Sequence, residues 1–144
     1  MRSMRGRNCT ASGMTFDQIL ERIRYEGAYP TRERAEAVTH AVLAGLGRQL
    51  TRDTRADLAA CLPAEAALTL TAQNPDADSL TGWEFVKDLA TRTGGTPATA
   101  RWDAGAVLAA VTRIAGPGLV DDVLAQLPPG YALLFGRAEL IQAA

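Results

Sequence analysis

The sequence predicts an all-α fold, a helical bundle built from two tandem three-helix repeats that share one core. The chain repeats itself: at an offset of 65 positions, the residues AVLA at 41–44 match the residues AVLA at 106–109. Internal repetition of this kind indicates one structural unit used twice. Apolar residues also recur at helical spacing in both copies, and no stretch shows the period-two alternation of a strand.

The repeats set the expected domain organisation. We expect a single all-α domain over 14–144, with repeat one over about 15–70, a linker over about 71–80 and repeat two over about 81–136. A unit of about 60 residues is marginal alone, so the two copies should share a core. Residues 1–13 contain three arginines and no acid, and we expect either a disordered tail or an extension from an upstream start site, since Met14 also makes a sensible start.

The first helix of each repeat is predicted to begin at a capping box. Thr15 with Gln18, and Thr81 with Glu84, have the spacing at which each side chain caps the other residue's backbone amide. Apolar residues then follow at helical spacing: Phe16, Ile19, Leu20 and Ile23 in the first copy, and Phe85, Val86 and Leu89 in the second. Trp83, in the first turn of the later helix, is expected to pack against the core.

The second helix of each repeat is predicted to begin at Thr31 and at Thr96. Pro97 then occupies the first helical position, where its missing amide hydrogen costs nothing. The expected buried stripes are Val38, Val42, Leu46 and Leu50 in the first copy, and Val107, Val111 and Ile114 in the second. Alanines and glycines flank these stripes, which favours close approach of the helices.

The third helix of each repeat is predicted to be short. It should run from about Asp53, as N-cap, to Leu62, and from about Gly118 to Leu127. A proline follows each leucine and disfavours helical geometry there. We expect a new turn to restart over 64–70 and over 131–135.

Several of these segments together resemble a known family. The residues ILERI at 19–23, AVL at 41–43 and LP at 62–63 have counterparts in FVKDL at 85–89, AVL at 106–108 and LAQLP at 124–128. This two-copy order resembles a bacterial family of helical proteins catalogued as domain of unknown function 2267. The resemblance covers about residues 15–136 and implies a helical bundle and bacterial origin, with no catalytic or binding residues. Trp102 departs from the pattern, because a polar helix residue is expected there.

Composition excludes several classes of function. The chain is 47% hydrophobic and 22% charged with a formal net charge of −1, as in an ordinary soluble globular protein. No apolar run approaches the roughly 20 residues of a membrane span, so we expect no membrane contact. Nucleic-acid binding is not expected, because glutamates interleave with the arginines of the first two helices, which are Arg22, Arg24, Arg32 and Arg34. Two cysteines and no apolar leader favour a cytoplasmic protein.

No constellation predicts catalysis, a cofactor or a metal ion. His40 is the only histidine, with Glu36 one turn earlier, and a zinc site needs three or four ligands. We therefore expect a solvated or half-buried structural histidine. Cys61 can form a couple with His40 only if neighbouring helices bring them together, and a buried, small apolar role is the commoner one for cysteine. The glycines at 94–95 follow a helix, which indicates a C-cap and turn rather than a phosphate loop.

The leading functional hypothesis is a non-catalytic module for protein interaction or self-association. Trp102 lies off the apolar stripe of its helix, so it is the candidate partner contact, although packing at the edge of the core is the alternative. The second hypothesis is a small-molecule binder or enzyme with a pocket between the two repeats. It predicts a cavity lined by polar groups near His40, Cys61 or the carboxylates.

Overall fold

A computed structural model of the chain describes residues 14–75 and 78–137, and these residues form eight helices and no strand. The helices are α2 (Phe16–Gly27), α3 (Arg32–Gln49), α4 (Arg52–Ala59), α5 (Ala64–Thr71), α6 (Gly82–Thr93), α7 (Pro97–Ala115), α8 (Pro117–Gln126) and α9 (Tyr131–Leu134). The all-α prediction is therefore confirmed. The predicted tail at 1–13 and two residues of the predicted linker, 76–77, lie outside the described residues.

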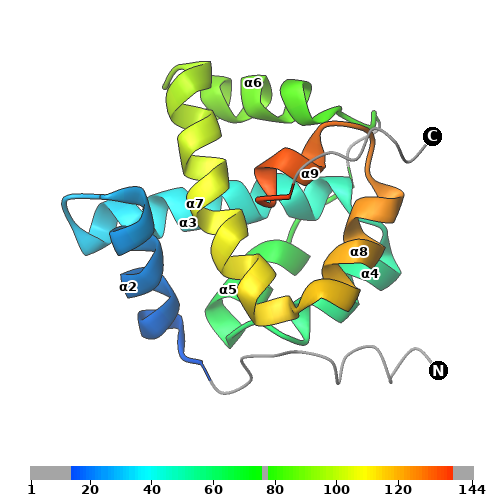
Figure 1. Ribbon diagram of the computed structural model, residues 1–144, viewed down its shortest axis with the longest axis horizontal. Coiled ribbons are helices and arrows are strands. Elements are labelled where there is room, and N and C mark those ends of the chain that lie inside the picture. The colour runs from blue at the N-terminus through cyan, green and yellow to red at the C-terminus, as the bar shows by residue number, and fades with distance from the viewer. Residues whose placement is uncertain (1–13, 76–77, 138–144) are drawn as a thin grey trace.

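The two long helices, α3 and α7, cross near the middle of the molecule, and the shorter helices surround them (Figure 1). α2 contacts both α3 and α7, α6 contacts both as well, and α4 contacts α8. One cluster of buried apolar side chains has members on all eight helices. The first and second halves of the chain therefore bury their apolar faces against each other.

Both predicted capping boxes are present. The Thr15 amide donates to Gln18 Oε1 at 2.9 Å while the Gln18 amide donates to Thr15 Oγ1 at 3.1 Å. The Thr81 and Glu84 pair has the same two bonds, at 2.9 and 3.2 Å. Each box satisfies two of the amides that a helix N-terminus leaves without an intrahelical acceptor.

Threonine is also the N-cap of α3, α4 and α7, and one predicted cap is wrong. Thr31 and Thr96 are the N-caps of α3 and α7, as expected, with Pro97 at the start of α7. The N-cap of α4 is Thr51, not Asp53, because Thr51 Oγ1 accepts from the Thr54 amide at 3.3 Å. Asp53 lies instead in the first turn, where its charge favours the helix dipole.

The leucine–proline pairs separate two helices in each half of the chain. α4 ends at Ala59, and Pro63 is the N-cap of α5, while α8 ends at Gln126 and α9 begins after Gly130. The expected restarted turns are thus the helices α5 and α9. Each half contains four helices where the sequence predicted three and a turn.

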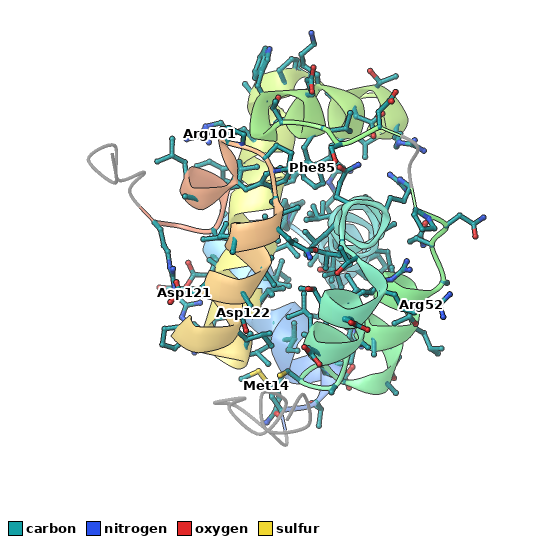
Figure 2. The ribbon with its side chains drawn as sticks, turned by 90° about the vertical axis from the view of Figure 1, so that its right-hand side faces the viewer. Met14, Arg52, Phe85, Arg101, Asp121 and Asp122 are labelled. Carbon is teal, nitrogen blue, oxygen red and sulfur yellow. The ribbon has the colours of Figure 1, made fainter. Side chains whose placement is uncertain are left out.

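Two glycines of α3 allow neighbouring helices to approach closely. A Cβ atom on Gly47 would lie 2.2 Å from the carbonyl oxygen of Leu70 in α5, and one on Gly45 would lie 3.0 Å from the Phe85 ring in α6. The predicted stripes are buried as expected, from Val38 to Leu50 and from Val107 to Ile114. In Figure 2, Phe85 points from α6 toward the interior, and Arg52 and Asp121 lie at the outer surface.

No helix among residues 14–75 and 78–137 combines the length and the apolar character that crossing a membrane requires. The longest described helix, α7, has 19 residues and includes Arg101, Asp103 and Arg113. Arg101 and Arg113 lie outside the buried core, and Asp103 is buried within it. That aspartate lines a cavity between α3, α6 and α7.

Candidate functional site

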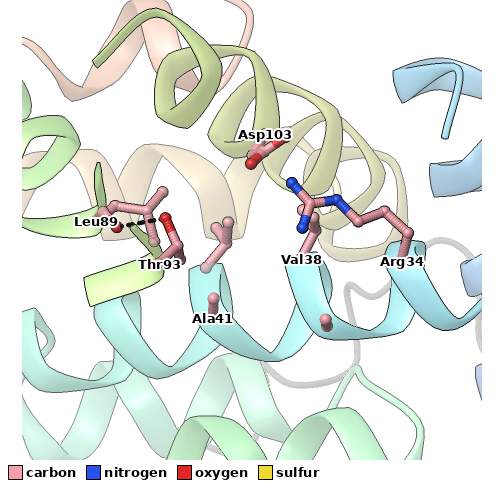
Figure 3. Close-up of a pocket in the computed structure, with 8 residues that line it drawn as sticks. Arg34, Val38, Ala41, Leu89, Thr93 and Asp103 are labelled. Atoms are coloured by element: carbon pink, nitrogen blue, oxygen red, sulfur yellow. Dashed lines mark hydrogen bonds between the residues drawn. The ribbon is translucent and has the colours of Figure 1, made fainter. Parts of the chain in front are cut away.

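A cavity of about 220 Å³ lies between α3, α6 and α7 (Figure 3). Its lining includes Arg34, Val38 and Ala41 from α3, Leu89 and Thr93 from α6, and Asp103 from α7. The cavity therefore lies where the first half of the chain meets the second, and its polar groups include one of the carboxylates.

The buried end of the cavity carries a carboxylate held by a tyrosine. The Tyr29 hydroxyl, in the loop after α2, donates to Asp103 Oδ1 at 2.6 Å, and the two residues are only 7% and 9% exposed. Burial raises the pKa of Tyr29 above its ordinary value, and the bond to Asp103 and its negative charge raise it further. Tyr29 consequently remains protonated and a hydrogen-bond donor, so it fixes the orientation of the Asp103 carboxylate.

The opposite charge at this cavity comes from Arg34. This residue is exposed, and Figure 3 shows its guanidinium extending over the cavity on the side of Asp103. Its backbone amide donates to Thr31 Oγ1, and its guanidinium forms no ion pair within the described parts of the chain. The cavity thus presents a buried negative charge and a solvated positive charge that do not neutralise each other by contact.

The wall between these charges is apolar. Val38 and Val42 come from the buried stripe of α3, and Leu89 faces them from α6. Thr93 lines the cavity too, and its hydroxyl donates to the Leu89 carbonyl at 2.9 Å. An apolar wall with a few fixed polar groups is typical of small-molecule sites in proteins.

A second feature is the exposed indole of Trp102 on α7. Its side chain is 60% exposed, yet the indole Nε1 donates to the Gly27 carbonyl at the end of α2, at 2.9 Å. A shallow groove of about 220 Å³ beside it is lined by Glu26, Trp102, Gly105 and Ala106. The hydrogen bond ties the indole to the end of α2, although most of Trp102 is exposed to solvent.

The structure does not bring His40 and Cys61 into one site. His40 Nδ1 is hydrogen-bonded to Thr69 Oγ1 at 2.6 Å, and Nε2 lies 3.7 Å from Glu36, as the spacing predicted. The ring also packs against Phe16, with centroids 5.7 Å apart. Cys61 is buried, and its Sγ lies 3.8 Å from the Asp57 carbonyl oxygen. In the described part of the chain, no group of three or more His, Cys, Asp or Glu side chains is placed to hold a metal ion.

Trp83 contradicts its prediction. It is 59% exposed instead of packing against the core, and the Lys87 ammonium lies 5.8 Å from its ring centroid. The cause is the register of α6, because Phe85 and Val86 take the buried positions of this turn. Three of the four arginines singled out in α2 and α3 are paired with acids as the interleaved sequence indicates, with Arg22 close to Glu26, Arg24 close to Glu21 and Arg32 close to Asp17.

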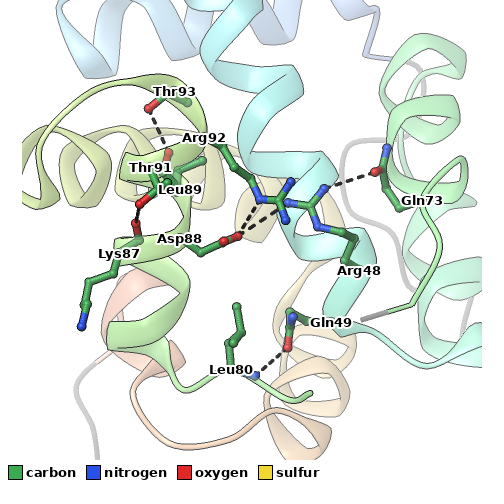
Figure 4. Close-up of polar contacts among 10 residues, drawn as sticks. All are labelled: Arg48, Gln49, Gln73, Leu80, Lys87, Asp88, Leu89, Thr91, Arg92 and Thr93. Atoms are coloured by element: carbon green, nitrogen blue, oxygen red, sulfur yellow. Dashed lines mark hydrogen bonds and ion pairs between the residues drawn. The ribbon is translucent and has the colours of Figure 1, made fainter. Parts of the chain in front are cut away.

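A cluster of charged and amide side chains joins α3 to the second half of the chain (Figure 4). Arg48 lies 3.9 Å from Asp88 and donates to Gln73 Oε1 at 3.3 Å, while Arg92 donates to Asp88 at 2.8 Å. Beside it, Gln49 Oε1 accepts from the Leu80 amide at 2.9 Å. These contacts link α3 to α6 and to the segment after α5.

The profile of a family described as "Uncharacterized conserved protein (DUF2267)" matches residues 16–134. The chain belongs to this family. The match spans α2 to α9, and so includes both the cavity at Asp103 and the exposed Trp102. A search of curated proteins found no match to the chain. Membership of the DUF2267 family therefore identifies the relatives of the protein, and its function has to be inferred from the geometry of the site.

Sequence analysis missed the pair of Tyr29 and Asp103 in this member of the DUF2267 family. A signal was available: Asp103 precedes Val107 by four residues, so it begins the predicted buried stripe of its helix. An acid in the register of a core stripe needs a partner, because burying an unpaired charge is costly. The identity of that partner, which is 74 positions away, required the tertiary structure.

Proposed function

We propose that the protein is a non-catalytic helical module that binds another protein, or a second copy of itself, through the surface around Trp102. The observation that carries this proposal is a large indole that is 60% exposed and fixed by its bond to the Gly27 carbonyl. Tryptophan is enriched among the residues that dominate binding energy at interfaces. A side chain already held in place also loses little conformational entropy on binding.

The surroundings of Trp102 support a protein partner. Gly105 and Ala106 lie beside the indole in a shallow groove, so a partner side chain can pack against the ring without steric obstruction. Glu26 borders the same groove and forms an ion pair with Arg113 at 3.2 Å. An aromatic centre with a polar rim is the usual composition of such a surface.

We also infer that the module consists of two tandem repeats. α2 and α6 have 12 residues each and begin with a capping box, and α3 and α7 have 18 and 19 residues and begin after a threonine. The bacterial and cytoplasmic assignments belong to the same proposal. The family resemblance supports the bacterial assignment, and the cytoplasmic assignment rests on the sequence alone.

Self-association is tested by sedimentation velocity over a range of protein concentrations. The matched pair of variants is Trp102→Ala and Trp83→Ala, because both indoles are exposed to the same extent and only Trp102 borders the groove. If the surface joins two copies, Trp102→Ala weakens the association by about 2 kcal/mol, the loss typical of a dominant interface residue, and Trp83→Ala does not.

A partner of different sequence is tested by photo-crosslinking in the host, with the crosslinking residue at the neighbouring, exposed Arg101. The captured protein is then purified, and its affinity for the wild type and both tryptophan variants is measured. The proposal is contradicted if the protein is monomeric and its purified partner binds Trp102→Ala as tightly as it binds the wild type.

A small-molecule binder or enzyme is the second candidate. The observation that favours it is the cavity between α3, α6 and α7, with a buried carboxylate and an arginine at its edge. It concerns a different surface from that of Trp102, so the two functions are tested independently.

A further inference from the structure

The cavity at Asp103 carries two opposite charges on two different helices. Asp103 on α7 is buried and Arg34 on α3 is exposed, and both line the same space. They form no ion pair with each other. The Tyr29 hydroxyl donates to Asp103 Oδ1, and no hydrogen bond from the described residues reaches the second oxygen, Oδ2.

This charge arrangement selects among possible ligands. A simple cation would be attracted by Asp103 and repelled by Arg34, and a simple anion would meet the reverse. A molecule with a positive and a negative group satisfies both side chains at once, because each of its charges faces the opposite one. A neutral apolar molecule would leave the carboxylate without compensation for the water it displaced.

The size and lining of the cavity limit the body of the ligand. Its volume of about 220 Å³ exceeds that of an engineered cavity of about 150 Å³ that holds benzene. A group of a few carbon atoms therefore fits. Val38, Ala41 and Leu89 belong to the apolar wall against which such a group would pack.

We infer that this cavity binds a small zwitterion, an aliphatic α-amino acid. Its ammonium group lies against the Asp103 carboxylate, its carboxylate group against the Arg34 guanidinium, and its side chain against Val38, Ala41 and Leu89. Tyr29 positions Asp103 and does not contact the ligand. The site joins the two halves of the chain, since Arg34 and Asp103 belong to different halves.

The first experiment measures binding of L-leucine by isothermal titration calorimetry on the full chain. Two analogues each lack one charge: 3-methylbutylamine has no carboxylate, and 4-methylpentanoate has no ammonium. Leucine should bind saturably, and each analogue should bind at least about tenfold more weakly, because it leaves one charged side chain unpaired. L-Valine and L-alanine should bind progressively more weakly, by about fourfold for each methylene lost.

Variants locate the site. Asp103→Asn keeps an acceptor for Tyr29 but removes the charge, and Ala41→Leu fills the cavity from its edge, so each should reduce leucine affinity by at least about tenfold. Arg34→Gln should reduce it by about threefold to tenfold, since this group is exposed and screened by water. Arg101→Gln is the control, because Arg101 is an exposed arginine of α7 outside the cavity lining, and it should leave the affinity unchanged.

Circular dichroism confirms that each variant is folded before its affinity is compared. If Asp103→Asn does not fold, the leucine affinities of Arg34→Gln and Ala41→Leu test the site instead, because Arg34 is exposed and Ala41 is only partly buried. The inference is overturned if none of the three amino acids binds saturably up to about 10 mM. It is equally overturned if leucine binds Ala41→Leu and Arg34→Gln as tightly as the wild type.

Discussion

The two halves of the chain share buried core positions and differ at several positions through which they bond to each other. At the 65-residue offset, Leu43 pairs with Leu108 and Val42 with Val107, and all four are buried. The positions that differ include Val38 with Asp103 and Ala37 with Trp102. In each of these two pairs, the residue of the second half bonds to the first half: Asp103 to Tyr29, and Trp102 to Gly27.

A third divergent pair lies at the ends of the short helices α4 and α8. Cys61 in the first half pairs with Gln126 in the second. Cys61 is buried, whereas Gln126 Oε1 accepts from the Thr51 amide at 2.9 Å and its Nε2 donates to Thr51 and Thr54. Gln126 thus caps α4 of the other half. The divergent residues Asp103, Trp102 and Gln126 thus hold the halves together and form part of the cavity and the exposed indole. The identical pair Arg48 and Arg113 also joins the halves, through ion pairs with Asp88 and Glu26.

The largest expected effect comes from the shared positions. Leu43→Ala and Leu108→Ala each remove a buried side chain, and each should lower the free energy of unfolding by about 3 kcal/mol. Because one apolar cluster contains both leucines, each variant should shift a single cooperative transition in urea, followed by circular dichroism.

The matched controls are Leu68→Ala and Leu133→Ala, which are also related by the offset but are exposed. They should change the free energy of unfolding by no more than about 0.5 kcal/mol. Two separate transitions, of which each core variant moves only one, would show that the halves fold independently and would break the comparison.

The next effect comes from making the second half resemble the first. Asp103→Val introduces the residue found at Val38 and leaves the buried Tyr29 hydroxyl without its acceptor, so it should cost about 2 kcal/mol in the free energy of unfolding. Adding Tyr29→Phe to this variant removes the hydroxyl that has lost its acceptor. The double variant should therefore recover most of that loss in the same urea experiment, and a purely additive result would show that the bond contributes nothing.

Alkaline pH provides a control for the same pair. The folded state raises the pKa of Tyr29, so the folded protein retains a proton that the unfolded chain loses above about pH 10. The stability from this group is complete below that pH and decreases as pH rises, by at most about 1.4 kcal/mol per pH unit. Tyr29→Phe should lose stability less steeply than the wild type above pH 10, and equal slopes would contradict the assigned cause.

The smallest effect concerns the ends of α2 and α6. Both helices end in the left-handed conformation, with Ala28 at φ 54° and Gly94 at φ 76°. A side chain in this conformation costs about 1 kcal/mol. Ala28→Gly should therefore raise the free energy of unfolding by up to about 1 kcal/mol, and Gly94→Ala should lower it by a similar amount.

The two caps make a clean comparison because space plays no part at Gly94, where an added Cβ would meet no atom within 4 Å. Thermal unfolding of the two variants measures both signs. If the two substitutions shift the melting temperature in the same direction, backbone strain is not the property that distinguishes these ends.

Much of the fold was predictable because it depends on local chemistry. The capping boxes at Thr15 and Thr81 and the start of α7 at Pro97 follow from contacts between residues three or four positions apart. The cap of α4 was mispredicted because Thr51 and Asp53 are both good N-cap residues, and only the geometry of the helix separates them. The burial of Trp83 was mispredicted because the first turn of α6 offers more apolar residues than the core accepts.

The candidate site was only partly predictable. The sequence singled out Trp102 because it lies off an apolar stripe, but its bond to Gly27 joins residues 75 positions apart. Asp103 stood in a core register without a visible partner. Tyr29 orients the Asp103 carboxylate, and Arg34 brings the opposite charge to the same cavity. Both residues lie in the first half of the chain.

The sequence by itself determined most of the helices and most of their caps, the buried stripes and the internal repetition, because hydrophobic periodicity and capping act over a few neighbouring residues. Only the tertiary structure decided how α3 crosses α7, and with it which charges share a cavity and which indole remains exposed. Those properties depend on contacts between residues far apart in the chain. Such contacts are set when the two apolar faces pack together, and no local pattern encodes them.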